Sequence, residues 1–220
     1  MRQAVPIKPV PLLVSAEGGL ARSIDQSGCR LPYALIKNSE GGHVEEVLNF
    51  WFHEVDPKKW WAAEPDFDRQ IRQRFAGLHE EASCGELASW RDTLRGRLAE
   101  IIVLDQFSRN IWRGTPRAFA QDGMALVLAQ EAIRAGALNE LPVVERSFVM
   151  LPFMHSESAA IHRQAERLYR EHAPVDNYQF ELRHKAIIDR FGRYPHRNAI
   201  LGRTSTQDEL TFLALPGSSF

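Results

Sequence analysis

Positive charge is concentrated in one short stretch of this chain. Residues 190–203, RFGRYPHRNAILGR, hold four arginines and one histidine but no carboxylate, although the formal net charge of the whole protein is only -1. An arginine side chain presents a planar fork of N–H donors that matches the oxygens of a carboxylate or a phosphate. The stretch therefore predicts a binding site for an anion. Its candidate ligand-binding residues are Arg193, His196, Arg197 and Asn198.

A second group of polar residues lies inside a strongly apolar segment, residues 98–112 (LAEIIVLDQFSRNIW). On a helix of 100° per residue this segment is apolar nearly all round, which is typical of a buried helix. Asp105 and Arg109 lie four residues apart on one apolar face, and burying a charge costs several kcal/mol unless it is paired. They are therefore expected either to form an internal salt bridge or to face a polar pocket. Because no acidic residue lies between Arg109 and Asp122, a pocket is expected, with the candidate lining residues Asp105, Arg109, Asn110 and Arg113.

The positions of His196 and Arg197 are unusual for a helix. Pro195 suits the first turn of a new helix, so both side chains are predicted to lie in that turn. The helix dipole disfavours cations there by a few tenths of a kcal/mol to about 1 kcal/mol each. An anion bound between the basic groups and the helix amides would explain this arrangement. The alternative is that an internal carboxylate, such as Asp105 or Glu157, fills that place.

Two histidines and a glutamate are candidates for acid–base chemistry. His155 and Glu157 follow Pro152, which is expected to break or kink its helix, and His184 lies further along the chain. These three residues could supply a catalytic acid and base. The alternative is a hydrogen-bonded brace at the helix break, which is favoured because no HExxH or paired-cysteine motif supports metal binding. We expect neither a metal ion nor a cofactor.

Local signals place most of these residues on helices. Apolar residues recur every three or four positions in residues 65–82, and alanine-rich residues 119–135 form a second expected helix. The expected end signals are glycines in the left-handed conformation, Gly136 and Gly192, and a capping box formed by Thr206 and Glu209. Because no convincing strand pattern or hairpin turn appears, the sequence predicts an all-α fold built from an array of helix pairs.

The first part of the chain differs in character from the rest. Residues 1–43 are punctuated by proline and glycine without a sustained helical period, which predicts a largely unstructured N-terminal extension. An upstream translation artefact is an alternative explanation for this segment. Residues 44–220 are expected to form a single helical domain.

Composition limits the classes of partner. The 27 basic and 28 acidic residues nearly balance, which argues against nucleic acid and membrane surfaces as partners because both require a large excess of positive charge. No run approaches the roughly 18 apolar residues of a transmembrane helix, and no signal peptide is recognisable. We therefore expect a cytoplasmic protein; the sequence leaves its oligomeric state open.

Long motifs carry a resemblance to a known family. They are VLNFWF (47–52), LAEIIVLDQFSRNIWRGTPRAFAQD (98–122), LPFMHSE (151–157), the arginine-rich stretch and the ending PGSSF. In these motifs the chain resembles the bacterial domain-of-unknown-function 924 family, a member of the tetratricopeptide-like helical superfamily. The resemblance implies a right-handed array of antiparallel helix pairs with a concave face, and it implies no activity.

Two functional hypotheses follow. The first is a binding module whose arginine- and histidine-lined groove holds a small anionic molecule or an acidic peptide. The second is a hydrolase in which His155, Glu157 or His184 acts on a substrate anchored by the arginines. The sequence does not decide whether the protein is an enzyme, although the absence of a nucleophile elbow, a phosphate-binding glycine loop and a Walker lysine favours the first hypothesis.

Overall fold

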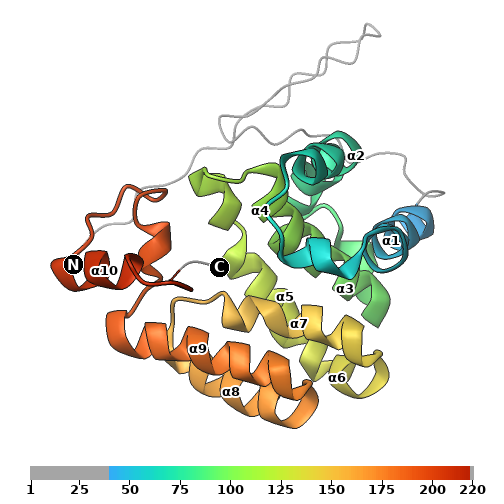
Figure 1. The fold of residues 1–220 in the computed structure, drawn as a ribbon. Coiled ribbons are helices and arrows are strands. Elements are labelled where there is room, and N and C mark those ends of the chain that lie inside the picture. The colour runs from blue at the N-terminus through green and yellow to red at the C-terminus, as the bar shows by residue number, and fades with distance from the viewer. Residues whose placement is uncertain (1–39, 219–220) are drawn as a thin grey trace, which may run out of the picture. The chain divides into compact units, whose positions relative to one another are not determined.

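Helices make up all the regular structure between residues 40 and 218, which are the residues that the computed structural model describes (Figure 1). No strand occurs in that range, so the predicted all-α class is confirmed. The described residues belong to one compact unit, Ile36–Phe220. The predicted extension, residues 1–43, lies outside the described residues except for its last four, which begin the first helix. The tetratricopeptide-like superhelix stays a prediction.

The elements follow one another with short connections. The first half contains α1 (Glu40–Asn49), the π-helical turn η1 (Phe50–Glu54), the 3-10 turn η2 (Pro57–Trp61), α2 (Pro65–Ser83), the 3-10 turn η3 (Ala88–Asp92), α3 (Leu94–Ile102), the π-helical turn η4 (Val103–Phe107) and α4 (Ser108–Ile111). The second half contains the 3-10 turn η5 (Pro116–Phe119), α5 (Asp122–Arg134), α6 (Ala137–Glu140), α7 (Val143–Met154), α8 (Ala159–His172), α9 (Val175–Phe191), the 3-10 turn η6 (Pro195–Arg197) and α10 (Gln207–Leu213).

Helix α2 forms where its apolar stripe predicts it. Phe67, Ile71 and Phe75 are buried on one side, and Asp66 lies in the first turn, where the helix dipole favours negative charge. The stripe packs against η4 and α4. Further along, α7 packs on α8 and α8 on α9, and the last two run side by side in Figure 1.

The centre of the fold is the segment that leads from α3 into η4. Leu98 and Ile101 have no exposed surface, and η4 lies between α2 and α5. The predicted buried helix is confirmed as far as Ile111, and within it the backbone widens into a π-helical turn at residues 103–107. π-helical turns within helices are frequent at functional sites, and this one carries the buried Asp105.

The predicted helix ends are largely confirmed. Gly136 and Gly192 adopt left-handed conformations with φ of 97° and 67°, and Thr206 and Glu209 form the complete capping box. The helix expected over residues 119–135 begins later, because η5 and a turn precede α5.

The helix expected to begin at Pro195 is only the three-residue turn η6. The chain turns back directly after it, because the Asn198 side chain donates to Ser205 and accepts from Arg203. A single 3-10 turn has little dipole, so the predicted conflict between cations and a helix N-terminus does not arise.

Among residues 40–218, no helix is both long enough and apolar enough to cross a membrane.

Candidate functional site

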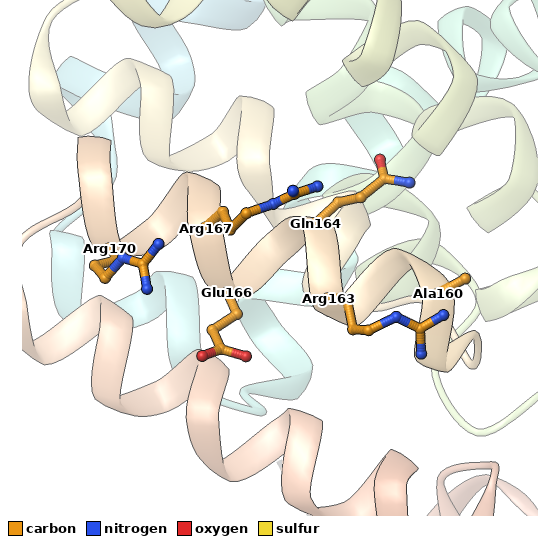
Figure 2. Close-up of a pocket in the computed structure, with 6 residues that line it drawn as sticks. All are labelled: Ala160, Arg163, Gln164, Glu166, Arg167 and Arg170. Carbon is orange, nitrogen blue, oxygen red and sulfur yellow. The ribbon is translucent and has the colours of Figure 1, made fainter.

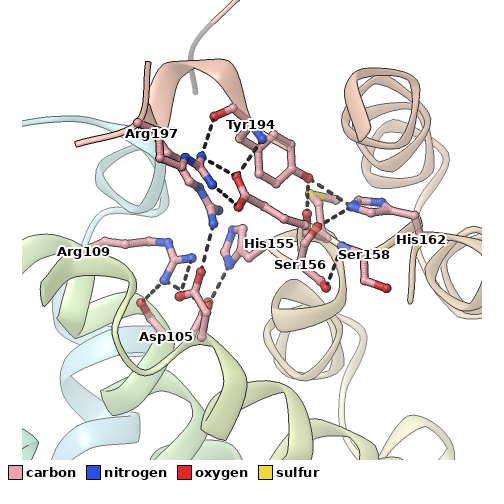
Figure 3. Close-up of polar contacts among 12 residues, drawn as sticks. Asp105, Arg109, His155, Ser156, Ser158, His162, Tyr194 and Arg197 are labelled. Atoms are coloured by element: carbon pink, nitrogen blue, oxygen red, sulfur yellow. Dashed lines mark hydrogen bonds and ion pairs between the residues drawn. The ribbon is translucent and has the colours of Figure 1, made fainter. Parts of the chain in front are cut away.

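A cavity of about 330 Å³ lies where η5 and the start of α5 meet the turn after α7 and the η6 segment. We call it the α5 pocket. The residues of its wall that matter for its chemistry are Phe119, Asp122, His155, Ser156, Glu157 and Arg197. Each comes from a segment that the sequence motifs singled out, and Figure 3 shows His155, Ser156 and Arg197 among the polar contacts of this region.

Asp105, on the π-helical turn, anchors the floor beneath the pocket. Its side chain is only 1% exposed, and Oδ1 lies 2.7 Å from His155 Nδ1 and 3.1 Å from Arg109 Nη1. The other oxygen, Oδ2, accepts a hydrogen bond from Gln106 Nε2 at 2.5 Å. Although burial opposes the charged form, Arg109 and His155 outweigh it and hold the pKa of Asp105 well below its ordinary value. Asp105 is therefore a buried carboxylate.

Asp122, in the first turn of α5, pairs with two arginines. Oδ1 forms an ion pair with Arg109 Nη2 at 3.0 Å, and Oδ2 accepts from Arg197 Nη1 at 3.1 Å. One carboxylate thus forms ion pairs with two guanidinium groups. Arg109 does not itself line the pocket but lies directly behind Asp122.

Arg197 packs against two aromatic rings. Its guanidinium carbon lies 4.6 Å from the ring centre of Phe119 and 4.6 Å from that of Tyr194. The side chain is 7% exposed, and Nε has no hydrogen-bond partner among residues 40–218. Burial, with a further contribution from Arg109, lowers the pKa of Arg197. Its positive charge is therefore incompletely balanced.

Three other arginines of this chain each pair their positive charge with both oxygens of one carboxylate. Arg91, Arg113 and Arg193 each use the edge formed by Nε and Nη2 to grip both oxygens of one carboxylate, at 2.5–2.9 Å. Accordingly the carboxylate partners raise the pKa of each of the three. No carboxylate of residues 40–218 pairs in this way with the same edge of Arg197.

His155 presents a neutral imidazole to the pocket. Burial, followed by the charge of Arg109, lowers its pKa, although Asp105 acts in the opposite direction. Nδ1 is engaged by Asp105, whereas Nε2 makes no hydrogen bond within the described residues. The turn that carries His155 directly follows α7.

Glu157 lines the pocket, but both its oxygens are engaged. Arg203 donates to Oε1 and Oε2 at 2.8 and 2.6 Å, and the Tyr194 N–H donates to Oε1 at 2.7 Å. These donors outweigh burial and lower the pKa of Glu157. Glu157 therefore braces the turn after α7 against the η6 segment through Arg203 and Tyr194, and not through a contact with His155, which binds Asp105 instead.

Several residues predicted to share the site lie elsewhere. Asn110 and Arg113 bind Asp68 on α2, and Arg193 binds Glu209 on α10. Asn198 holds the turn described above. These residues had been grouped by their position along the chain, and each is instead bound by a carboxylate or hydroxyl that the sequence pattern did not indicate.

His184 and His196 pack around Tyr194 and do not line the pocket. His184 Nδ1 contacts the Phe180 carbonyl oxygen at 2.8 Å. Burial lowers the pKa of His184 to about 3 and that of His196 to about 4, so both are neutral near pH 7. In this position they contribute packing beneath the site.

The site also includes three residues that were not predicted from the sequence: Phe119, Asp122 and Tyr194. Asp122 carried a usable signal, because it is the first acidic residue after Arg109. The two aromatic residues carried none, since their role depends on where Arg197 lies in space.

A second hollow, of about 580 Å³, runs along the outer face of α8 (Figure 2). Arg163, Arg167 and Arg170 project from that face and are exposed. Within residues 40–218, no group of three or more metal-ligating side chains is placed to hold a metal ion.

Comparisons with known proteins identify the family. A family model described as a bacterial protein of unknown function (DUF924) matches residues 47–217. A solved structure of a protein of unknown function from Agrobacterium tumefaciens is similar, with 34% sequence identity and a TM-score of 0.75, over 79% of this chain and 98% of that one. No curated protein matches. The chain therefore belongs to the DUF924 family of bacterial proteins.

Proposed function

We propose that the α5 pocket binds a small anionic ligand through Arg197, and that the protein is a binding module for it. The observation that carries the proposal is that Arg197 lines the pocket and, within residues 40–218, pairs with one carboxylate only, Asp122, which it shares with Arg109. A carboxylate or phosphate of a ligand would give this guanidinium a second anionic partner. The rings of Phe119 and Tyr194 pack close to the guanidinium and restrict its motion, which reduces the entropy lost on binding.

Electrostatics supports an anion at this position. Asp122 is shared between Arg109 and Arg197, so neither arginine has a carboxylate to itself on that side. Arg109 also has Asp105, whereas no second carboxylate of the described residues lies within 4 Å of Arg197. An added anion would oppose the two effects that lower the pKa of Arg197, which are its burial and the charge of Arg109.

The size of the pocket favours a small molecule over an acidic peptide. Its volume of about 330 Å³ corresponds to roughly eleven water molecules at ~30 Å³ each. A ligand of this size would place one anionic group at Arg197 and its remaining atoms against Leu126 and Leu201, which also line the pocket.

Thermal unfolding with a panel of anions tests the proposal. The panel holds succinate, inorganic phosphate, glycerol 3-phosphate and a short acidic peptide, which separates carboxylate, phosphate and peptide recognition. A ligand at 100 times its Kd stabilises the folded state by about 2.7 kcal/mol. In the Arg197→Lys variant, which keeps the charge but loses the fork, most of that stabilisation should disappear. The exposed Arg167→Lys variant is the matched control, and equal stabilisation of both variants would refute the role of Arg197.

A second candidate function is hydrolysis, and the contact between Asp105 and His155 favours it. Asp105 orients the neutral imidazole, and Nε2 makes no hydrogen bond within the described residues, as a general base requires. Glu157 and His184 do not share this suitability, because the first is fully paired and the second does not line the pocket. Release of nitrophenol from anionic 4-nitrophenyl esters, lost in His155→Phe, would establish this activity. A cytoplasmic location stays a prediction.

A further inference from the structure

We propose that the ligand of the α5 pocket is a small hydroxy acid, whose anionic group binds Arg197 and whose hydroxyl group donates a hydrogen bond to His155 Nε2. This inference rests on the proposed function and adds the chemical class of the ligand. It follows from the protonation of His155, which the contacts of Asp105 determine.

The first step concerns Asp105, which acts only as an acceptor. Gln106 Nε2 donates to one of its oxygens, and Arg109 Nη1 lies 3.1 Å from the other. The Arg109 guanidinium also donates to the main-chain carbonyl of Asp105 at 2.7 Å. With these donors around it, the carboxylate is ionised and requires a hydrogen at His155 Nδ1, 2.7 Å away.

The second step concerns the other ring nitrogen. In a neutral imidazole one nitrogen carries the hydrogen and the other is an acceptor. Since Nδ1 carries it, Nε2 holds a lone pair. No donor of the described residues reaches Nε2, and His155 lines the same pocket as Arg197. The His155 side chain is 16% exposed, so a ligand in the pocket can bring a donor to this lone pair in place of water.

The third step distinguishes a hydroxyl from other donors. Arg109 already disfavours a proton on His155, so the same charge disfavours an ammonium group beside Nε2. A second carboxylate of the ligand, placed beside Nε2, would be repelled by the lone pair of that nitrogen and by the carboxylate of Glu157. A hydroxyl is neutral and donates to Nε2. It can also accept from Ser156, whose Oγ accepts a hydrogen bond from the Ser158 N–H and thus keeps its own hydrogen free to donate.

Matched ligand pairs test the inference by calorimetry on the full chain. Malate is compared with succinate, 3-hydroxybutyrate with butyrate, and glycerol 3-phosphate with propyl phosphate. The hydroxylated member of the series that binds should have a Kd roughly 5 to 10 times lower, as expected for one additional neutral hydrogen bond in a partly buried site. Aspartate, compared with succinate, tests an ammonium group at the same place and should bind no better than succinate.

Two variants connect the preference to His155. His155→Phe removes the acceptor and should abolish the preference while binding of the unsubstituted anion persists. Asp105→Ala removes the acceptor that holds the imidazole hydrogen on Nδ1, so the preference should weaken here as well, in a protein that retains the histidine. His53→Phe, at an exposed histidine outside the pocket, is the control and should keep the preference.

Each outcome has a distinct meaning. Equal affinity within every pair, or a lower Kd for aspartate than for malate, would overturn the hydroxy-acid inference and leave the anion site intact. Persistence of the preference in His155→Phe would also overturn it. Failure of every ligand to bind would instead refute the proposed function.

Discussion

Removal of the Tyr194 hydroxyl group should destabilise the protein without altering the ring that holds Arg197. Tyr194 is fully buried, and its hydroxyl donates to the Met154 carbonyl at the end of α7. The same oxygen lies 3.1 Å from His162 Nε2 on α8. The Tyr194→Phe variant therefore leaves a buried carbonyl without this donor but creates no large cavity.

The expected loss can be estimated from these contacts. A buried group left unsatisfied costs about 1–3 kcal/mol, so the free energy of unfolding should fall by about that amount. For a domain of this size the midpoint of thermal unfolding should fall by roughly 2–4 °C per kcal/mol. Urea unfolding of both proteins measures the first quantity and scanning calorimetry the second.

Tyr178→Phe provides the control for Tyr194→Phe. Tyr178 is half-buried on α9 and its hydroxyl makes no hydrogen bond within residues 40–218, so this variant should change stability by less than about 0.5 kcal/mol. If the two variants lose the same amount, the Tyr194 hydroxyl does not connect the segments as described. Since the ring still stacks on Arg197, anion binding to Tyr194→Phe should remain close to that of the unmodified protein.

Two further predictions concern stability. The folded-state pKa of His79 and of His196 is about 4, lowered by burial, so the folded form binds fewer protons than the unfolded form between about pH 6.5 and pH 4. The free energy of unfolding should therefore fall as the pH falls through this window, by up to about 3 kcal/mol from His79. Urea unfolding at pH 7, 5.5 and 4.5 measures this loss. A constant free energy of unfolding over this range would contradict the prediction. In Gly96→Ala the new Cβ would lie 1.9 Å from the Trp90 carbonyl oxygen, so the backbone must shift and stability should fall clearly. Gly77→Ala, in an open position on α2, should instead stabilise by up to about 1 kcal/mol, and the opposite order of the two variants would refute this account of the packing.

Much of the helical structure could be predicted from the sequence, because helix signals act over a few residues. The apolar stripe of α2 and the capping box at Thr206 depend only on neighbours three or four positions away. Gly136 and Gly192 end their segments because a residue without a side chain adopts positive φ without strain.

The sequence also predicted one charged contact. Asp105 and Arg109 lie four positions apart on an apolar helix face, where unpaired charges are costly, and the structure shows the salt bridge that was one of the two expected outcomes. This contact could be predicted because it depends on neighbours along one helix. The arginine excess of residues 190–203 directed the candidate site to Arg197, whose role in binding stays a prediction.

Only the tertiary structure decided which charges meet. Arg113 pairs with Asp68, which lies 45 positions away in the sequence, and Arg197 pairs with Asp122, which lies 75 positions away. No local sequence pattern predicts either pair. In a protein of balanced charge, an arginine is structural or available to a ligand according to whether a carboxylate lies within about 4 Å of its open edge. Helix propensity does not determine that distance; it follows from the way the helices pack.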